Sequence, residues 1–460
     1  MSRKFYRLGL LIVLLSFVYG SDTLVLELNQ AIDLALQNNK SILIAQEKVK
    51  AQIASKNAAR AAFLPSVSLS GTYTRLAESQ GFPMSIAIPG KISFPVYDFS
   101  GNIIGFTESI PTTIRTITET LNLVNKDNYN VGAKVTQTLF TWGKLINAYQ
   151  IAGLALDMEK ESYEQAIEDL KLQVIESFYK TILAEKTLQL MQESYAQMQR
   201  HISQIEKLYQ SGMVGQLDLL RARVQLANMR SQVIRIENGY RLAQSALKLL
   251  IGLSDEKHLK LQGEFEFSGY NIDLDTAIKS ALQYRRDLNN MRRTVQMLEK
   301  GLAIARTANL PSIFSAFNYS YAKPLSVTQN DWGANWNATI GVSMPLSLGG
   351  ANWYKMKESK AQLKQAQLGL AMLEDAVKLD VQSKLLTLKQ EEEIFSYQAE
   401  NVRTAEQALV LAEEKYQNGL ITNLEYLDTQ LALTQAKLEQ MNAIANCIIA
   451  KAKLLNAIGQ

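Results

Sequence analysis

Two acidic residues stand out in this sequence by their type and spacing, Glu425 and Asp428. They follow the turn-like segment Tyr416-x-x-Gly419, and a separation of three residues puts both carboxylates on one face of a helix. Carboxylates gathered at a narrow mouth concentrate negative potential and thereby select cations. Acids in the first turn of a helix also stabilise the helix dipole, so a structural role at a helix start is the alternative interpretation.

The remaining chemically capable residues give no sign of catalysis. His201 and His258 have no cysteine or carboxylate at metal-ligand spacing, so we expect both to be ordinary surface histidines. The acidic run 391–393 is typical of a solvated helix face. The sequence contains no glycine-rich phosphate loop, nucleophile motif or metal-ligand cluster. We therefore expect neither enzymatic activity nor a cofactor or bound metal.

The first twenty residues are typical of a cleavable secretion signal. Three cations, Arg3, Lys4 and Arg7, precede an apolar run over residues 8–19, which is too short to span a bilayer. The only cysteine is Cys447, so we expect no internal disulfide and no lipid anchor after the signal. The formal net charge of the whole chain is only +4, which argues against a nucleic-acid partner.

The chain contains an internal duplication. Residues 28–39 align with residues 274–285 with six identities, at an offset of 246. Residues 209–227 align with residues 416–434 at an offset of 207. The offsets differ by 39, which indicates that the first half carries an insertion of about that length. We place it in segment 76–127, whose glycine, proline and serine content predicts a long loop.

The positions of the prolines predict where long helices can form. All eight prolines lie in the windows 65–111 and 311–345, and interior proline breaks helices, so the remainder of the chain is free to be helical. From Leu188 to Tyr209 apolar residues recur at alternating spacings of three and four, which is the seam of a coiled coil. The predicted helices are 27–63, 144–210 and 216–251 in the first half, and 274–309, 351–417 and 423–458 in the second.

Each proline-containing window holds two segments in which apolar and polar residues alternate. They predict strands over 66–75, 129–140, 312–323 and 335–347, each close to the length of a membrane-spanning strand. The aromatic residues Tyr73, Trp332 and Trp336 and the small polar opposite face favour lipid outside and water inside, with a small soluble sheet as the alternative. Four strands cannot close a barrel, whereas three chains would supply twelve.

The predicted organisation has four parts: a signal over 1–20, a first repeat over 21–252, a linker over 253–272 and a second repeat over 273–460. In order and spacing these features resemble the TolC-like outer-membrane efflux protein family over the whole mature sequence. The motifs that carry the resemblance are the LxxAIxxALxxN opening, Ala-Arg-x-x-x-Leu-Pro before the first strand, the duplicated hairpins and two Tyr-x-x-Gly turns. The resemblance implies an α+β membrane protein, in which a homotrimer forms a twelve-stranded outer-membrane β-barrel continued by a periplasmic α-helical barrel, with the linker at its equator.

The resemblance also assigns roles to residues near the second turn. Glu425 and Asp428 match the acids of the pore constriction, and Tyr416 and Asp218 match a tyrosine and an aspartate that hold the closed gate. Ile421 stands where the family has a gate arginine, so we expect a weaker closed-state lock.

Partners and location follow from the same resemblance. A periplasmic adaptor protein would dock at the turns, through Tyr209, Gly212, Tyr416 and Gly419. An inner-membrane pump of the RND, ABC or MFS class would supply the energy, and outer-membrane lipid would surround the barrel. The expected function is a passive exit duct for efflux or type I secretion in the outer membrane, extending into the periplasm. The alternative is a secreted structural coiled-coil surface protein without a pore.

Overall fold

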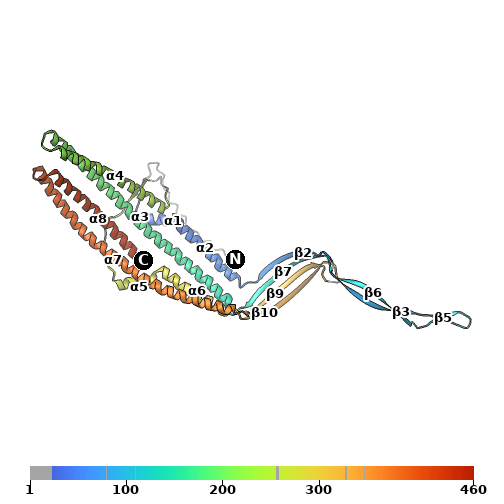
Figure 1. The fold of residues 1–460 in the computed structure, drawn as a ribbon. Helices are drawn as coiled ribbons and strands as arrows, with labels where there is room; N and C mark the ends of the chain where they lie inside the picture. The colour runs from blue at the N-terminus through green and yellow to red at the C-terminus, as the bar shows by residue number, and fades with distance from the viewer. Residues whose placement is uncertain (1–22, 79, 109, 255–257, 327–328, 347) are drawn as a thin grey trace, which may run out of the picture. The chain divides into compact units, whose positions relative to one another are not determined.

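The computed structural model describes residues 23–460 except 79, 109, 255–257, 327–328 and 347 (Figure 1). The signal predicted over residues 1–20 lies outside the described residues. The chain divides into two compact units. The helical unit comprises residues up to 54, 153–298 and 361–460, and the sheet unit comprises 55–152 and 299–360.

Two helices of 67 residues each dominate the chain, α3 (Lys144–Gln210) and α7 (Ala351–Gln417). Each is followed by a helix of 35 residues, α4 (Gln216–Leu250) or α8 (Asn423–Ala457). These bounds agree with the predicted ranges to within one residue, and a helix of this size is about 100 Å long at 1.5 Å per residue. No helix among the described residues combines the length and apolar character needed to cross a membrane.

The first helical hairpin, α3–α4, is held together by an apolar seam near its turn. The coiled-coil spacing read in the sequence brings these side chains to one face of α3, where burial of each large one contributes about 1.5–3 kcal/mol. The buried members on α3 are Met198, Ile202 and Ile205, those on α4 are Leu219, Ala222 and Met229, and α8 adds Leu427.

The helices predicted over 27–63 and 274–309 are each divided in two, so the prediction of one continuous helix was wrong. The pairs are α1 (Leu28–Asn38) with α2 (Lys40–Ala61), and α5 (Leu274–Tyr284) with α6 (Arg286–Arg306). At the first break Asn39 is extended, and its side chain donates to the Leu250 carbonyl (2.8 Å). The second break is at Arg285, whose guanidinium bonds Asp380 (2.7 Å). Side-chain bonds thus stabilise two breaks that no proline marks.

The predicted linker 253–272 contains a short strand that we did not predict. This strand, β8 (His258–Leu261), pairs in parallel with β1 (Thr23–Leu26). Leu26 and Leu259 are buried there in the apolar cluster that α1, α3 and α4 share.

The sheet unit contains one antiparallel four-stranded sheet with the order β10-β9-β7-β2. Two strands have the predicted bounds, β2 (Ser66–Arg75) and β9 (Ser312–Lys323). The other two are shifted by a few residues, β7 (Asp127–Phe140) and β10 (Gly333–Ser343). Tyr73 of β2 is paired with Tyr129 of β7 and the two rings stack at 4.8 Å, so the aromatic residues gather at one end of the sheet.

Segment 76–127 is a β-ribbon, so the prediction of a long loop was wrong. β3 (Gln80–Ile92) pairs antiparallel with β6 (Ile110–Val124), and the tip is formed by β4 (Pro95–Tyr97) and β5 (Ile103–Phe106). In a two-stranded ribbon both strands are edges, so a proline can occupy a position whose N–H would face away from the partner. The prolines of this segment are therefore compatible with strands, although they had favoured a loop in the sequence.

Candidate gate at the helical hairpin turns

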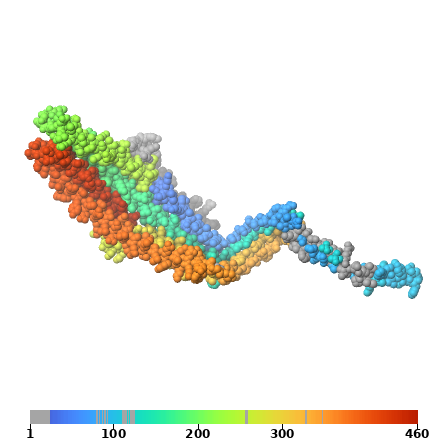
Figure 2. Space-filling view, in the orientation of Figure 1, coloured from blue at the N-terminus to red at the C-terminus, as the bar shows by residue number. Residues whose placement is uncertain are grey.

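The two helical hairpins end in turns with the same geometry, exposed at the same end of the helical unit (Figures 1 and 2). The Gly212 N–H donates to the Tyr209 carbonyl and the Gly419 N–H to the Tyr416 carbonyl, both at 3.0 Å. The two glycines have φ of 75° and 70°, a conformation that costs a residue with a Cβ about 1–2 kcal/mol. The predicted docking residues thus form two matching turns.

Glu425 lies at the start of α8, in a capping box with Thr422. The Thr422 backbone N–H donates to Glu425 Oε2 (2.7 Å), and the Glu425 N–H donates to Thr422 Oγ1 (3.3 Å). The first of these bonds is the main cause that lowers the pKa of Glu425, so its exposed carboxylate stays ionised. Glu425 therefore does cap the start of a helix, as the structural alternative expected. It also keeps the negative charge that a cation-selecting pore would require.

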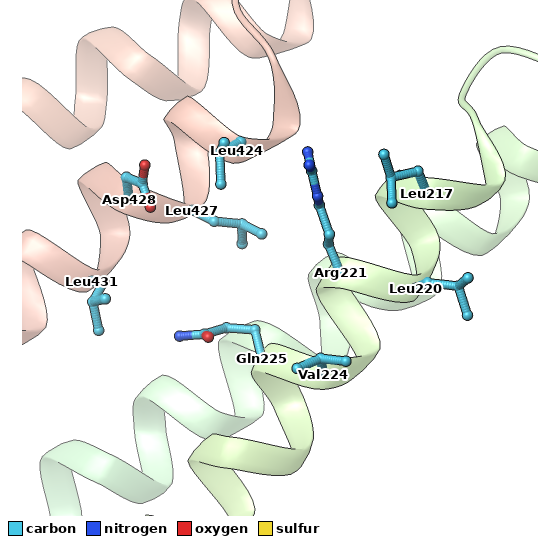
Figure 3. A pocket seen from close by; sticks show the side chains of 9 residues that line it. All are labelled: Leu217, Leu220, Arg221, Val224, Gln225, Leu424, Leu427, Asp428 and Leu431. Atoms are coloured by element: carbon cyan, nitrogen blue, oxygen red, sulfur yellow. The ribbon is translucent and has the colours of Figure 1, made fainter.

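Asp428 lies three residues further along α8, exposed beside an open groove between α8 and α4 (Figure 3). The guanidinium of Arg221 extends from α4 toward the start of α8. Most of the groove is apolar, and much of this surface is exposed in the single chain, which is typical of a face that receives a neighbour. The other residues that line it are Leu217, Leu220, Val224 and Gln225 on α4, and Leu424, Leu427 and Leu431 on α8.

The predicted gate pair, Tyr416 and Asp218, is brought into one region but is not joined by a hydrogen bond. Burial, followed by the charge of Asp218, raises the pKa of the Tyr416 phenol. The hydroxyl is itself buried and has no hydrogen-bond partner within the described chain. Ile421, at the position of the family's arginine, is half-buried. The Tyr416 hydroxyl is therefore a buried polar group that the described chain leaves without a hydrogen bond.

His201 is buried, so the prediction of a surface histidine was wrong. Its side chain is 6% exposed, and Nε2 lies 2.7 Å from Oδ1 of Asn423 at the start of α8. The imidazole also packs against two tyrosine rings, Tyr416 at 5.5 Å and Tyr426 at 4.8 Å between centroids. A second buried stripe on α3 also has coiled-coil spacing, and consists of Ser194, Met198, His201 and Ile205. It was not predicted, because two of its members are polar and break the apolar pattern. Its partner Asn423 is 222 positions away, which no local pattern indicates.

His201 is part of a row of polar contacts between α3 and α8, here called the polar seam. Ser194 Oγ lies 3.4 Å from Thr434 Oγ1, and Gln430 Nε2 donates to Gln197 Oε1 at 3.3 Å. Gln430 is 7% exposed and its Oε1 has no partner within the described chain. The seam therefore joins the two hairpins through neutral polar groups, whereas α3 and α4 are joined by apolar ones. The seam consists of Ser194, Gln197 and His201 on α3, with Thr434, Gln430 and Asn423 on α8.

Comparisons with known proteins agree on one family and one fold. A family model described as outer membrane efflux protein matches residues 31–253 and 277–460. The cation efflux system protein CusC of Escherichia coli (strain K12) is 23% identical over 316 residues, which are 68% of each chain. The outer membrane protein TolC of Salmonella enteritidis is 20% identical over 346 residues, 74% of this chain and 70% of that protein. A solved membrane protein from Pseudomonas aeruginosa shares the fold, with a TM-score of 0.76 at 18% identity over 94% of this chain and 90% of that one.

Proposed function

Because this chain belongs to the outer membrane efflux protein family, we propose that it is the outer-membrane exit duct of a tripartite efflux or type I secretion system. In this role it is a passive, gated channel that spans the outer membrane and extends into the periplasm. The energy for transport comes from a separate pump, and the chain itself catalyses no reaction.

The observation that carries the proposal is the pair of open edges of the four-stranded sheet. Within the described chain, β2 and β10 each have one sheet neighbour, so both present unpaired backbone groups. Lipid cannot satisfy such groups, whereas a barrel closed by pairing each β2 with the β10 of the next copy satisfies all of them. Four strands are too few for closure, and a homotrimer with twelve strands is consistent with the known range of barrels.

The same threefold axis would gather the hairpin turns of three chains into one mouth. Glu425 and Asp428 would then form two rings of carboxylates, and the lowered pKa of Glu425 supports a ring that stays charged. In the closed state Tyr416 and the carboxylate of Asp218 would hold neighbouring hairpins together, once assembly brings a partner to the Tyr416 hydroxyl, which the single chain buries without one. The missing arginine at Ile421 removes one ion pair from this lock.

The exposed turns are the proposed docking sites for a periplasmic adaptor protein. Their two glycines leave open space around the backbone, since a Cβ built at either meets no heavy atom within 4 Å. The adaptor would in turn connect the duct to an inner-membrane pump of the RND, ABC or MFS class.

Single-channel conductance of the detergent-purified protein in a planar bilayer tests the proposal. The wild type is compared with a Glu425→Gln, Asp428→Asn double variant, which retains the shape of both side chains. We expect small cation-selective openings in the wild type and larger or unselective ones in the variant. A silent bilayer with folded, trimeric protein would instead favour the structural coiled-coil surface protein, which the family match does not support.

A further inference from the structure

Four helices of the helical unit contribute to the surroundings of one buried imidazole, that of His201 on α3. α8 supplies Asn423, whose Oδ1 accepts a hydrogen bond from Nε2–H, and the ring of Tyr426. α7 supplies the ring of Tyr416, which stacks on Tyr426 at 5.2 Å. α4 contributes Asp218, whose charge acts on Tyr416. The imidazole is thus placed where the second hairpin meets the first.

These surroundings favour the neutral imidazole. Burial lowers the pKa of His201, opposed only in part by its hydrogen bond with Asn423. Asn423 is the first residue of α8, so the positive end of that helix dipole faces the ring and also disfavours an imidazolium.

The charged groups around the site do not reverse this preference. The anions of α4 and α7, Asp218 and Glu413, act on the phenols of Tyr416 and Tyr426. The carboxylate of Glu425 on α8 is bound by Thr422. The adjacent α3 cation, Arg200, is exposed. The imidazole therefore has aromatic and amide contacts in place of a carboxylate partner.

We propose that His201 is an acid-sensitive latch of the gate, which holds the start of α8 against α3 while neutral and releases it on protonation. The latch rests on the channel function proposed above and adds a regulation to it. The polar seam suits such a release, because parting it exposes amides and hydroxyls that water can solvate. The apolar surface exposed at the start of α8 is that of Leu427 and Tyr426.

The direction of the pH effect follows from linkage. We take this structure as the closed state, in which the pKa lies below the ordinary value near 6.5; in an open state with a solvated ring it returns toward that value. The closed state is therefore fully favoured above the ordinary pKa and loses stability as pH falls below it. Each unit by which the two pKa values differ shifts the gating equilibrium tenfold per chain.

Open probability in planar bilayers between pH 7.5 and 5 tests the latch, since the lowered pKa of Glu425 keeps that pore carboxylate ionised over this range. The wild type should open more as pH falls. His201→Gln keeps a donor for Asn423 but cannot titrate, and it should lose this step. Asn423→Asp places a carboxylate beside the imidazole and raises its pKa in the closed state, so the step should shrink or reverse. His258→Gln replaces the only other histidine and should leave the step in place.

The outcomes separate the latch from the channel function. A wild type that conducts, with a pH step that is unchanged in His201→Gln or in Asn423→Asp, overturns the latch and leaves the channel. A folded wild type that is silent at every pH overturns the channel itself. NMR titration of the two histidines in the closed, detergent-purified protein gives an independent readout, and a His201 pKa at or above the ordinary value overturns the latch.

Discussion

Ser194 on α3 and Thr434 on α8 face each other across a buried helix interface, with their hydroxyl oxygens 3.4 Å apart. The two side chains are 4% and 8% exposed although 240 positions separate them in the sequence. No other part of the polar seam places two small side chains so close within the described chain. This pair therefore offers a direct way to fasten the two hairpins together.

We predict that a Ser194→Cys, Thr434→Cys variant forms a disulfide that holds the channel closed until it is reduced. The two sulfurs would replace hydroxyl oxygens that lie 3.4 Å apart, so a rotamer change or a small helix shift brings them to the S–S bond length of about 2.05 Å. The native cysteine should not interfere, because burial, reinforced by Glu391 and Glu392, raises the pKa of the Cys447 thiol to about 12. Conductance before and after reduction is the measurement, with each single-cysteine variant as its control. An oxidised double variant that opens normally would show that gating leaves this seam intact.

We predict that Thr422→Ala destabilises the start of α8 by about 1 kcal/mol, because it removes the side chain that caps the helix. Hydrogen exchange of the first-turn amides of α8 should become faster. Thr404→Ala is the matched control, since Thr404 is exposed within α7 and its hydroxyl only donates to the carbonyl of Glu400. Equal exchange at α8 in both variants would argue that the capping box adds little.

We predict that Tyr416→Phe and Asp218→Asn each increase conductance. The Tyr416 hydroxyl is buried without a partner in the described chain, so its removal should leave the fold intact, and a gain in conductance would come from a bond that the hydroxyl makes in the assembled gate. Tyr426→Phe serves as control, because its ring stacks in the same cluster but has no predicted gate role. Conductance unchanged in both gate variants would remove these residues from the lock.

We predict that Gly212→Leu with Gly419→Leu abolishes co-purification with a periplasmic adaptor protein. Both positions have positive φ, so the change strains the turns as well as filling the space beside them. Gly239→Leu is the matched control, since a Cβ at Gly239 on α4 also meets open space without a positive φ. A stable complex with the double variant would place the docking surface elsewhere.

The long helices and the four-stranded sheet could be predicted because their signals are local and repeated. Helix α3 has its predicted bounds, since its sixty-seven residues contain no proline and its last turns, from Leu188 to Tyr209, carry the coiled-coil spacing. The break at Asn39 could not be predicted, because it depends on a bond to the carbonyl of Leu250, 211 positions away. The ribbon β3–β6 was missed because a proline count takes no account of whether a strand is an edge.

In the candidate site, too, the features with a local sequence signal could be predicted and those that depend on distant residues could not. The turns and the helix-start position of Glu425 could be predicted, because glycine and an acid just after a turn have a direct local meaning, whereas the capping box with Thr422 was found only in the structure. The burial of His201 was not visible, because the position is polar and its partner belongs to the other repeat.

The equal lengths of corresponding helices, 67 and 67 or 35 and 35 residues, restrict how this protein can change during evolution. One inserted residue rotates everything beyond it by about 100° and carries seam residues such as Ile205 away from their partners. An insertion of seven residues preserves the seam, but in one repeat alone it makes that hairpin longer than the corresponding hairpin of the other repeat. Lineages of this chain can therefore lengthen or shorten it only in whole heptads, made together in the paired helices of both repeats.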